Sequence, residues 1–156
     1  MRFEHVIEIN SPATSVQVVV PTFTREQLWR GLMIRVREPQ RFPMGPDGCD
    51  CQESEAGLFQ RTLRFGSHLF QDEVRAEPLQ RLIFTPQAHG EIAPIRLTVS
   101  IEEPQAGQMV LRFIYEALAE QSAEEVYYND SRHNAWLHVD RDMVRTLRQW
   151  LSDDGL

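Results

Sequence analysis

Lysine is absent from this chain of 156 residues, and all 16 basic residues are arginine. The absence excludes mechanisms that need a lysine amine, such as a Schiff base, a phosphate-loop lysine or a Ser-x-x-Lys nucleophile. Basic side chains are also outnumbered by 23 acidic ones, which gives a formal net charge of −7 at pH 7. Because we find no basic stripe of the kind that nucleic-acid readers carry, we expect no nucleic-acid partner.

Long apolar runs are missing as well. No segment approaches the roughly 18 apolar residues that are needed to cross a bilayer, so no membrane partner is expected. Residues 1–5 already contain an acidic side chain and do not resemble the apolar core of a signal peptide. These absences predict a cytoplasmic protein.

Cysteine is scarce, since Cys49 and Cys51 are the only two in the chain. Residues two apart seldom form a disulfide, and a secreted disulfide-rich scaffold would carry more cysteines. A Cys-x-Cys pair holds a metal only with further ligands, and there is no second cysteine pair. We therefore interpret both as buried thiols on a strand and expect neither a metal nor a cofactor.

Familiar catalytic signatures are also lacking: there is no Gly-x-Ser-x-Gly, His-Glu-x-x-His, Gly-x-Gly-x-x-Gly or Walker motif. His133 and His138 lie on different faces of a predicted helix. Asp130 and His133 share a face, but an iron–carboxylate site would need further partner helices. We interpret these residues as an exposed polar face and assign no catalytic residue from motifs.

The composition, with 42% hydrophobic and 25% charged residues, is typical of a soluble globular protein. At this length one core is sufficient, and we expect a single domain over residues 1–156. Residues 3–10 alternate as a strand, and residues 16–20 resume extended character. Thr24 and Gln27 form a capping box that begins a helix, and this helix ends before Pro39.

The pattern of the remaining sequence predicts a loop with one short helical turn over residues 39–48, followed by consecutive antiparallel strands and a final helix. The strands are separated by short turns and cover residues 49–55, 58–65, 68–76, 80–86, 94–102 and 108–117. A second capping box, Ser122 with Glu125, begins a helix that runs to about Leu151. A curved sheet with one apolar face must cover that face, and only the long helix is large enough to do so.

Four stretches carry a resemblance to a known family: residues 3–10 (FEHVIEIN), 24–32 (TREQLWRGL), 63–66 (LRFG) and 98–104 (TVSIEEP). The chain resembles the AtaL-like family within the START, Bet v-type allergen and polyketide-cyclase (SRPBCC) superfamily. The resemblance implies an α+β helix-grip fold, in which a curved seven-stranded antiparallel sheet wraps around a long C-terminal helix. A cavity between the sheet and the helix is where ligands bind in such a fold.

The hairpin around Gly66 and Ser67 is the most informative local feature. A two-residue loop with glycine first predicts a type II′ turn, which pairs Phe65 with His68 and Arg61 with Asp72. Five of the eight side chains that share this face are apolar, so we expect the face to point inward. The Arg61–Asp72 pair is then either a structural cross-strand ion pair or a polar anchor in an apolar pocket.

The other candidate ligand-binding residues follow from alternation and helical position. His68 would lie near the mouth of the cavity, and His5 and Tyr115 point inward by alternation. Tyr128 and Ser131 could reach down from the helix, whose residues 127–135 we expect to line or gate the cavity, while residues 136–151 pack as core.

Three function classes fit this sequence. The first is a module that binds or carries a small hydrophobic molecule with a polar end, whose acidic or carbonyl oxygen Arg61 would hold. The second is an enzyme of the cyclase or dehydratase kind, with His68, Asp72, His5 or Tyr115 as acid and base. The third is an interaction protein. Binding is favoured because no motif fixes an acid–base pair, and nothing in the sequence indicates an oligomer.

Overall fold

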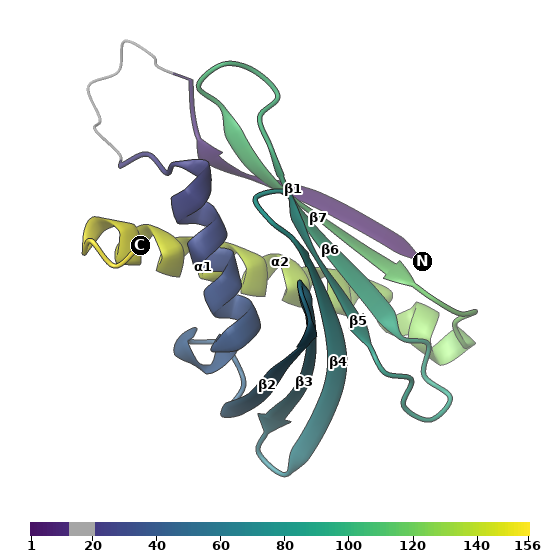
Figure 1. Cartoon of the computed structure of the whole chain (residues 1–156). Coiled ribbons are helices and arrows are strands. Elements are labelled where there is room, and N and C mark those ends of the chain that lie inside the picture. Colours follow the sequence, from purple (N-terminus) through teal and green to yellow (C-terminus); the bar gives the residue numbers. More distant parts are fainter. Residues whose placement is uncertain (13–20) are drawn as a thin grey trace.

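The structure, a computed structural model, describes residues 1–12 and 21–156, so the extended segment expected at residues 16–20 lies outside the described residues. The elements follow the predicted order of strand, helix, six strands and helix (Figure 1). They are β1 (Arg2–Asn10), α1 (Arg25–Arg37), the 3₁₀ turn η1 (Pro39–Arg41), β2 (Gly48–Glu55), β3 (Leu58–Phe65), β4 (His68–Glu77), β5 (Arg81–Pro86), β6 (Ile95–Glu102), β7 (Met109–Ala117) and α2 (Ala123–Ser152).

The seven strands form one antiparallel sheet in the order β1-β7-β6-β5-β4-β3-β2. Every neighbouring pair except β1 with β7 is consecutive in sequence, as expected for a meander with short turns. The strand limits agree with the predicted ones to within one residue. The predicted fold class, a curved antiparallel sheet with a long C-terminal helix, is confirmed.

Both predicted capping boxes are present. The Thr24 side chain accepts a hydrogen bond from the Gln27 backbone N–H at 3.1 Å, and the Gln27 side chain accepts from the Thr24 N–H at 2.9 Å. Ser122 and Glu125 make the same pair of bonds at the start of α2. These bonds satisfy N–H groups that have no partner within the helix, and this is why the two helices begin where the sequence predicts.

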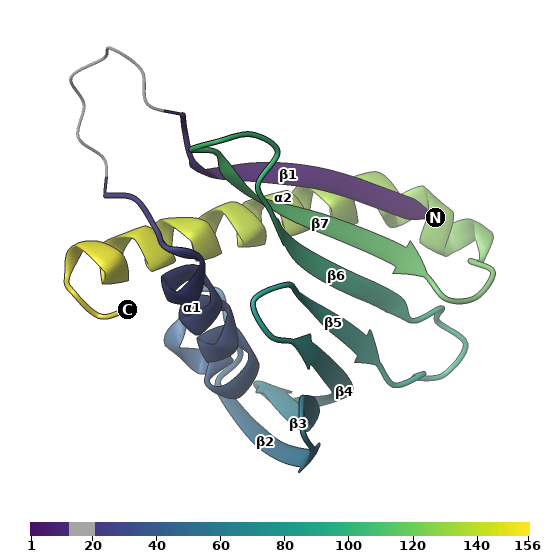
Figure 2. The same ribbon diagram turned by 45° about the horizontal axis from the view of Figure 1, so that its top comes forward.

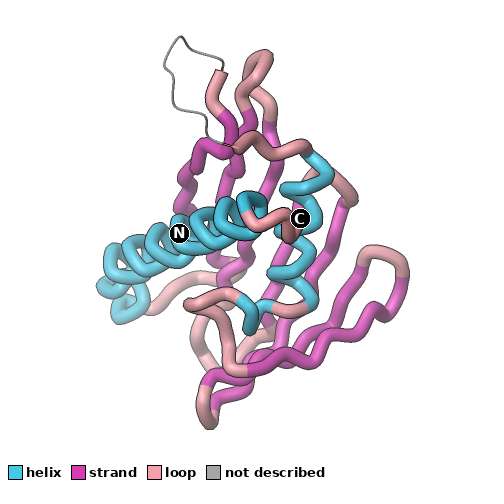
Figure 3. The backbone as a smooth tube through the Cα atoms, turned by 90° about the vertical axis from the view of Figure 1, so that its left-hand side faces the viewer, coloured by secondary structure: helices cyan, strands magenta, loops and turns pink. Residues whose placement is uncertain are grey.

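In Figure 2, α2 runs alongside the edge strand β1, and in Figure 3 both helices lie against the same face of the sheet. The core between these layers is apolar and includes Leu28 and Leu32 of α1, Leu147 of α2, and Val99 and Phe113 of the sheet. Neither helix in the described part of the chain is long and apolar enough to span a membrane.

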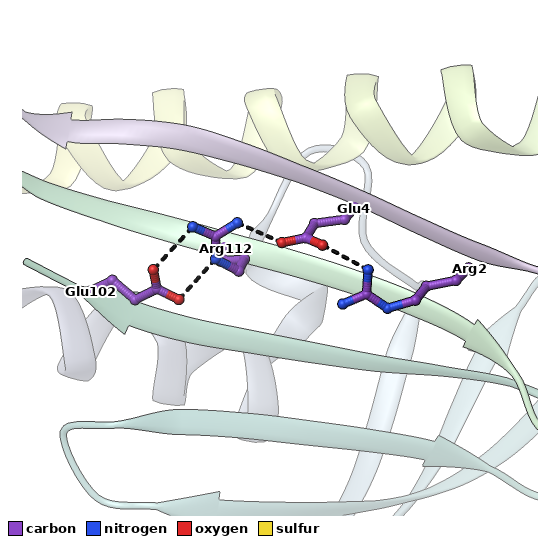
Figure 4. Close-up of polar contacts among 4 residues, drawn as sticks. All are labelled: Arg2, Glu4, Glu102 and Arg112. Carbon is purple, nitrogen blue, oxygen red and sulfur yellow. Dashed lines mark hydrogen bonds and ion pairs between the residues drawn. The ribbon is translucent and has the colours of Figure 1, made fainter. Parts of the chain in front are cut away.

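The opposite face of the sheet is charged. Arg112 on β7 donates two hydrogen bonds to Glu102 on β6 and one to Glu4 on β1, and Glu4 accepts a further bond from Arg2 (Figure 4). Bonds from the two arginines lower the pKa of the Glu4 carboxyl. Because this face presents paired charges across three strands, we expect a site for an apolar ligand on the other face, which the helices cover.

Candidate functional site

The β3–β4 hairpin has the turn and the register that the sequence predicts. Gly66 adopts a φ of 58°, as the first position of a type II′ turn requires. Phe65 is paired with His68, and Arg61 with Asp72. The hairpin thus places a guanidinium and a carboxylate directly opposite each other on neighbouring strands.

Arg61 is buried and bonded on two sides. Its Nε and Nη2 atoms donate to the two carboxylate oxygens of Asp72 at 2.8 and 2.6 Å. Its Nη1 donates at 3.1 Å to the backbone oxygens of Arg35 and Val36, near the end of α1. Within the described residues a single N–H of the five is left for a ligand, so Arg61 mainly ties α1 to the sheet.

A cavity of about 260 Å³ lies between the sheet, the middle of α2 and the chain that follows α1. Most of its wall is apolar, including Phe42, Leu63, Phe84, Leu97, Val139 and Met143. Four charged side chains also reach it: Arg35, Arg61, Asp72 and Asp142. This is the place between sheet and helix where the sequence predicts a ligand site.

Two guanidinium groups meet the ring of Phe84 in the cavity wall. The Cζ atoms of Arg61 and Arg35 lie 5.2 and 5.5 Å from the ring centroid, within the range of cation–π attraction. Arg35 differs from Arg61 in its hydrogen bonds, since in the described part of the chain only its Nη1 donates, to Met143 Sδ at 3.2 Å. Arg35 is therefore the better supplied with free donors.

Behind Arg35 lies a buried polar cluster centred on Asp140 of α2. Tyr115 Oη and His5 Nε2 lie 2.6 and 2.8 Å from Asp140 Oδ2 and donate to it. Arg35 Nη1 lies 3.5 Å from the other carboxylate oxygen. Burial, with the Asp140 charge adding to it, raises the pKa of the Tyr115 hydroxyl, which thus stays protonated and donates. The cluster joins β1, β7, α1 and α2.

The structure does not bring the predicted site residues together in one place. Arg61 and Asp72 line the cavity, as expected. His5 and Tyr115 do point inward, but they meet at Asp140 and are not among the residues that line the cavity. Tyr128 is about half exposed on the front part of α2, so a role for it at the cavity stays a prediction.

The end of the β3–β4 hairpin is more exposed than the sequence predicts. His68, Phe65 and Phe70 are exposed. The two phenylalanine rings pack edge to face, with their centroids 5.6 Å apart. The expectation that this whole face is covered is wrong at the hairpin end. The exposed end borders a second hollow of about 560 Å³, which shares Leu63, Phe65 and Asp72 with the cavity.

The front part of α2 also departs from one expectation. His133 does not belong to an exposed polar face: its ring stacks on Phe3 of β1 at 4.2 Å, and its Nε2 is buried with no hydrogen-bond partner among the described residues. Burial lowers the pKa of His133. The stacking occurs because α2 runs alongside the edge strand β1, which helical spacing alone does not reveal.

Cys49 and Cys51 lie on β2 as free, half-buried thiols, and burial raises the pKa of each. Among residues 1–12 and 21–156, no three His, Cys, Asp or Glu side chains gather closely enough to hold a metal ion.

The family is shown by a match over nearly the whole sequence. The profile of the AtaL family, described as "Acetylaranotin biosynthesis cluster protein L", matches residues 7–154. The chain belongs to the AtaL family. No curated protein sequence matches it at a significant level.

Solved structures with the fold of this AtaL-family chain include aromatase/cyclases. One is the di-domain ARO/CYC StfQ of the steffimycin biosynthetic pathway, with a TM-score of 0.68 and 11% identity over 99% of this chain. The chain spans only about half of StfQ, 51% of its length. Another is the Zhui aromatase/cyclase from Streptomyces sp. R1128, with a TM-score of 0.59 and 11% identity over 97% of this chain and 95% of Zhui.

A third similar structure is protein MLL2253 from Mesorhizobium loti, which has a TM-score of 0.61 and 18% identity over the full length of both chains. At these identities the likeness establishes the fold alone.

Two residues of the site, Arg35 and Asp140, were not singled out from the sequence, although each leaves a signal there. Arg35 is seven residues after Leu28 and three after Leu32, so it shares the apolar face of its helix. Asp140 lies four residues after Trp136 and seven before Leu147, within the apolar stripe of α2. A charged residue at a core-facing helical position is the pattern that indicates such a buried group.

Proposed function

We propose that this AtaL-family protein binds a small, mainly apolar molecule in the cavity between the sheet and α2. The observation that carries the proposal is the make-up of the wall, an apolar lining with the Arg35 and Arg61 guanidinium groups against the Phe84 ring. Ligand sites commonly combine an apolar surface with a few polar groups that fix orientation. The aromatase/cyclases among the structural neighbours support a ring-bearing oxygenated ligand.

The polar end of this ligand is expected to be a neutral oxygen acceptor, such as a ketone or a phenol. Each guanidinium already has a carboxylate nearby, Asp72 for Arg61 and Asp140 for Arg35. Asp142 adds a further negative charge to the wall. A ligand carboxylate would lose its hydration in the cavity, and the guanidinium charges that could compensate for this loss are already paired with carboxylates. A carbonyl oxygen carries no charge and needs only a free N–H donor.

A cyclase-like or dehydratase-like reaction in the same cavity is the second candidate, supported by the aromatase/cyclases among the structural neighbours. Such chemistry needs an acid or a base within hydrogen-bond reach of the ligand. Of the acid–base candidates, Asp72 is among the residues that line the cavity, but both of its carboxylate oxygens accept hydrogen bonds from Arg61. Within the described residues no histidine lines the cavity, and Tyr115 does not line it either. Binding is therefore the function that this geometry supports better. A cytoplasmic location remains a prediction from the sequence.

Three naphthalenes of similar size test the binding proposal by calorimetric titration. They are 2-acetylnaphthalene, 2-naphthoate and 2-ethylnaphthalene, which carry a ketone, a carboxylate and no polar group. We expect the ketone to bind about tenfold more tightly than the hydrocarbon, the value of one hydrogen bond to a charged donor. The carboxylate should bind no more tightly than the ketone.

Arg35→Met should remove the preference for the ketone and leave the affinity for the hydrocarbon. Arg64→Met is the matched control, because Arg64 lies on β3 but is exposed and not among the residues that line the cavity. Absence of binding by all three probes to the unaltered protein, or equal affinities in Arg35→Met and unaltered protein for each probe, would contradict the proposal.

A further inference from the structure

Asp140 is fully buried, and only one of its two carboxylate oxygens accepts hydrogen bonds. Its Oδ2 atom accepts hydrogen bonds from Tyr115 and His5. Its Oδ1 atom has no hydrogen-bond partner within the described residues, although it has no contact with solvent. A carboxylate oxygen buried in this way is costly to the fold, so a purely structural cluster would be expected to satisfy it.

The unsatisfied oxygen faces the cation of the cavity wall. Arg35 Nη1 lies 3.5 Å from Oδ1, which is ion-pair distance without a hydrogen bond. Charges attract each other strongly at this distance where water is excluded. The other contact of Nη1, to Met143 Sδ, is to a weak acceptor that carries no charge. Asp140 is thus the anionic group that draws the guanidinium to its place.

We propose that Asp140 is a positioning residue for the ligand cavity, which holds the Arg35 guanidinium where its free N–H groups meet the oxygen of the ligand. Tyr115 and His5 fix the orientation of the carboxylate through Oδ2, so that Oδ1 stays directed at Arg35. Asp140 does not touch the ligand and acts only through Arg35. This inference rests on the proposed function, because it assigns a role within the same site.

A purely structural role would have a different signature. Asp140 also ties α2 to β1 and β7, and loss of that tie would loosen the cavity for every ligand. A positioning role affects only ligands that carry an oxygen for Arg35. The ratio of the affinities for 2-acetylnaphthalene and 2-ethylnaphthalene separates the two roles, because the hydrocarbon reports on the cavity without the polar contact.

The experiment is calorimetric titration of both naphthalenes into the unaltered protein, Asp140→Asn, Arg35→Met and the double variant. We expect Asp140→Asn to lower the affinity ratio about tenfold, as for a lost bond to a charged group. In the Arg35→Met background, Asp140→Asn should not change the ratio further. Arg64→Met is the control: Arg64 is exposed and is not among the residues that line the cavity, so this variant should leave the ratio unchanged.

An unchanged ratio in Asp140→Asn, or a further fall of the ratio in the double variant, would overturn the positioning role. If Asp140→Asn does not fold, Tyr115→Phe tests the same inference, since it removes one hydroxyl from the carboxylate and keeps the ring that stacks on Trp136 at 4.2 Å. The ratio should then fall at least threefold, and an unchanged ratio would refute the inference. Failure of the proposed function is distinguishable, because then neither probe binds the unaltered protein.

Discussion

Arg61 and Asp72 face each other across β3 and β4 and form a two-point ion pair, with N–O distances of 2.8 and 2.6 Å. The same guanidinium donates to two backbone oxygens at the end of α1. One side chain thus joins two strands and a helix at the edge of the cavity. Of the two interpretations of this pair, the structural one accounts for four of the five N–H groups of Arg61, and a ligand contact would use the fifth.

Arg61→Met is accordingly expected to destabilise the protein by about 3 kcal/mol, because it leaves a nearly buried carboxylate and two carbonyl oxygens without a donor. Urea unfolding monitored by circular dichroism measures the loss. Arg64→Met on the exposed face of the same strand should change the free energy of unfolding by less than about 0.5 kcal/mol. Equal effects of the two variants would show that Arg61 does not tie α1 to the sheet.

Gly31 and Leu147 form the close contact between α1 and α2. A Cβ atom at Gly31 would lie 2.6 Å from Leu147 Cδ2, so Gly31→Ala should destabilise by about 1–3 kcal/mol despite the better helix propensity of alanine. Leu147→Ala alone should cost about 2–5 kcal/mol, since Leu147 is fully buried. The double variant should be more stable than the sum of the two losses predicts, and strict additivity in urea unfolding would contradict this contact.

The two halves of α2 should respond differently to truncation. Trp136 stacks on Tyr115, whereas Tyr128 is half exposed. Trp136→Ala is expected to cost about 3 kcal/mol, near the low end for large aromatic deletions, and Tyr128→Ala less than about 0.5 kcal/mol. If Tyr128 gates the cavity, its alanine variant will change the rate or affinity of 2-acetylnaphthalene binding with little change in melting temperature. Comparable losses of stability in both variants would disprove the division.

His133 should make the stability depend on pH. Burial lowers its pKa below the usual 6.5, with Arg132 adding to the shift and Asp130 opposing it. The unfolded chain therefore binds a proton at a higher pH than the folded protein does. The stability from this residue is complete above pH 6.5 and falls as the pH drops from there through the lower pKa of the folded state.

The measurement is the melting temperature of the unaltered protein and of His133→Phe between about pH 7.5 and about pH 5.5, a range that spans the titration of histidine. The variant keeps an aromatic ring that can stack on Phe3. The unaltered protein should lose more stability on acidification than the variant. Parallel curves would show that the pKa of His133 is the same in the folded and unfolded states. Carboxyl groups such as that of Glu4 affect the stability only at lower pH, because their usual pKa is 4.5 and the arginine partners of Glu4 lower it further.

The sequence by itself determined the local structure and the strand register that a short turn imposes. The capping residues Thr24 and Ser122 define where the helices begin, because a cap needs only residues within three positions of it. The glycine of the β3–β4 turn defines the register, because a two-residue loop allows one pairing, and this is how Arg61 and Asp72 could be paired in advance. The fold class followed from the order of such elements.

Only the tertiary structure decided which side chains meet across elements. Asp140 and His5 are 135 positions apart, and their contact depends on α2 lying alongside β1. The packing of α1 also decided that the donors of Arg61 are used by backbone oxygens, so that Arg35 is the freer cation. The end of the β3–β4 hairpin is not covered by the helices. Phe70 is therefore exposed to solvent, although it lies on a face whose pattern indicates burial. Periodicity shows which face of an element is apolar, but the fit of distant side chains determines what covers that face.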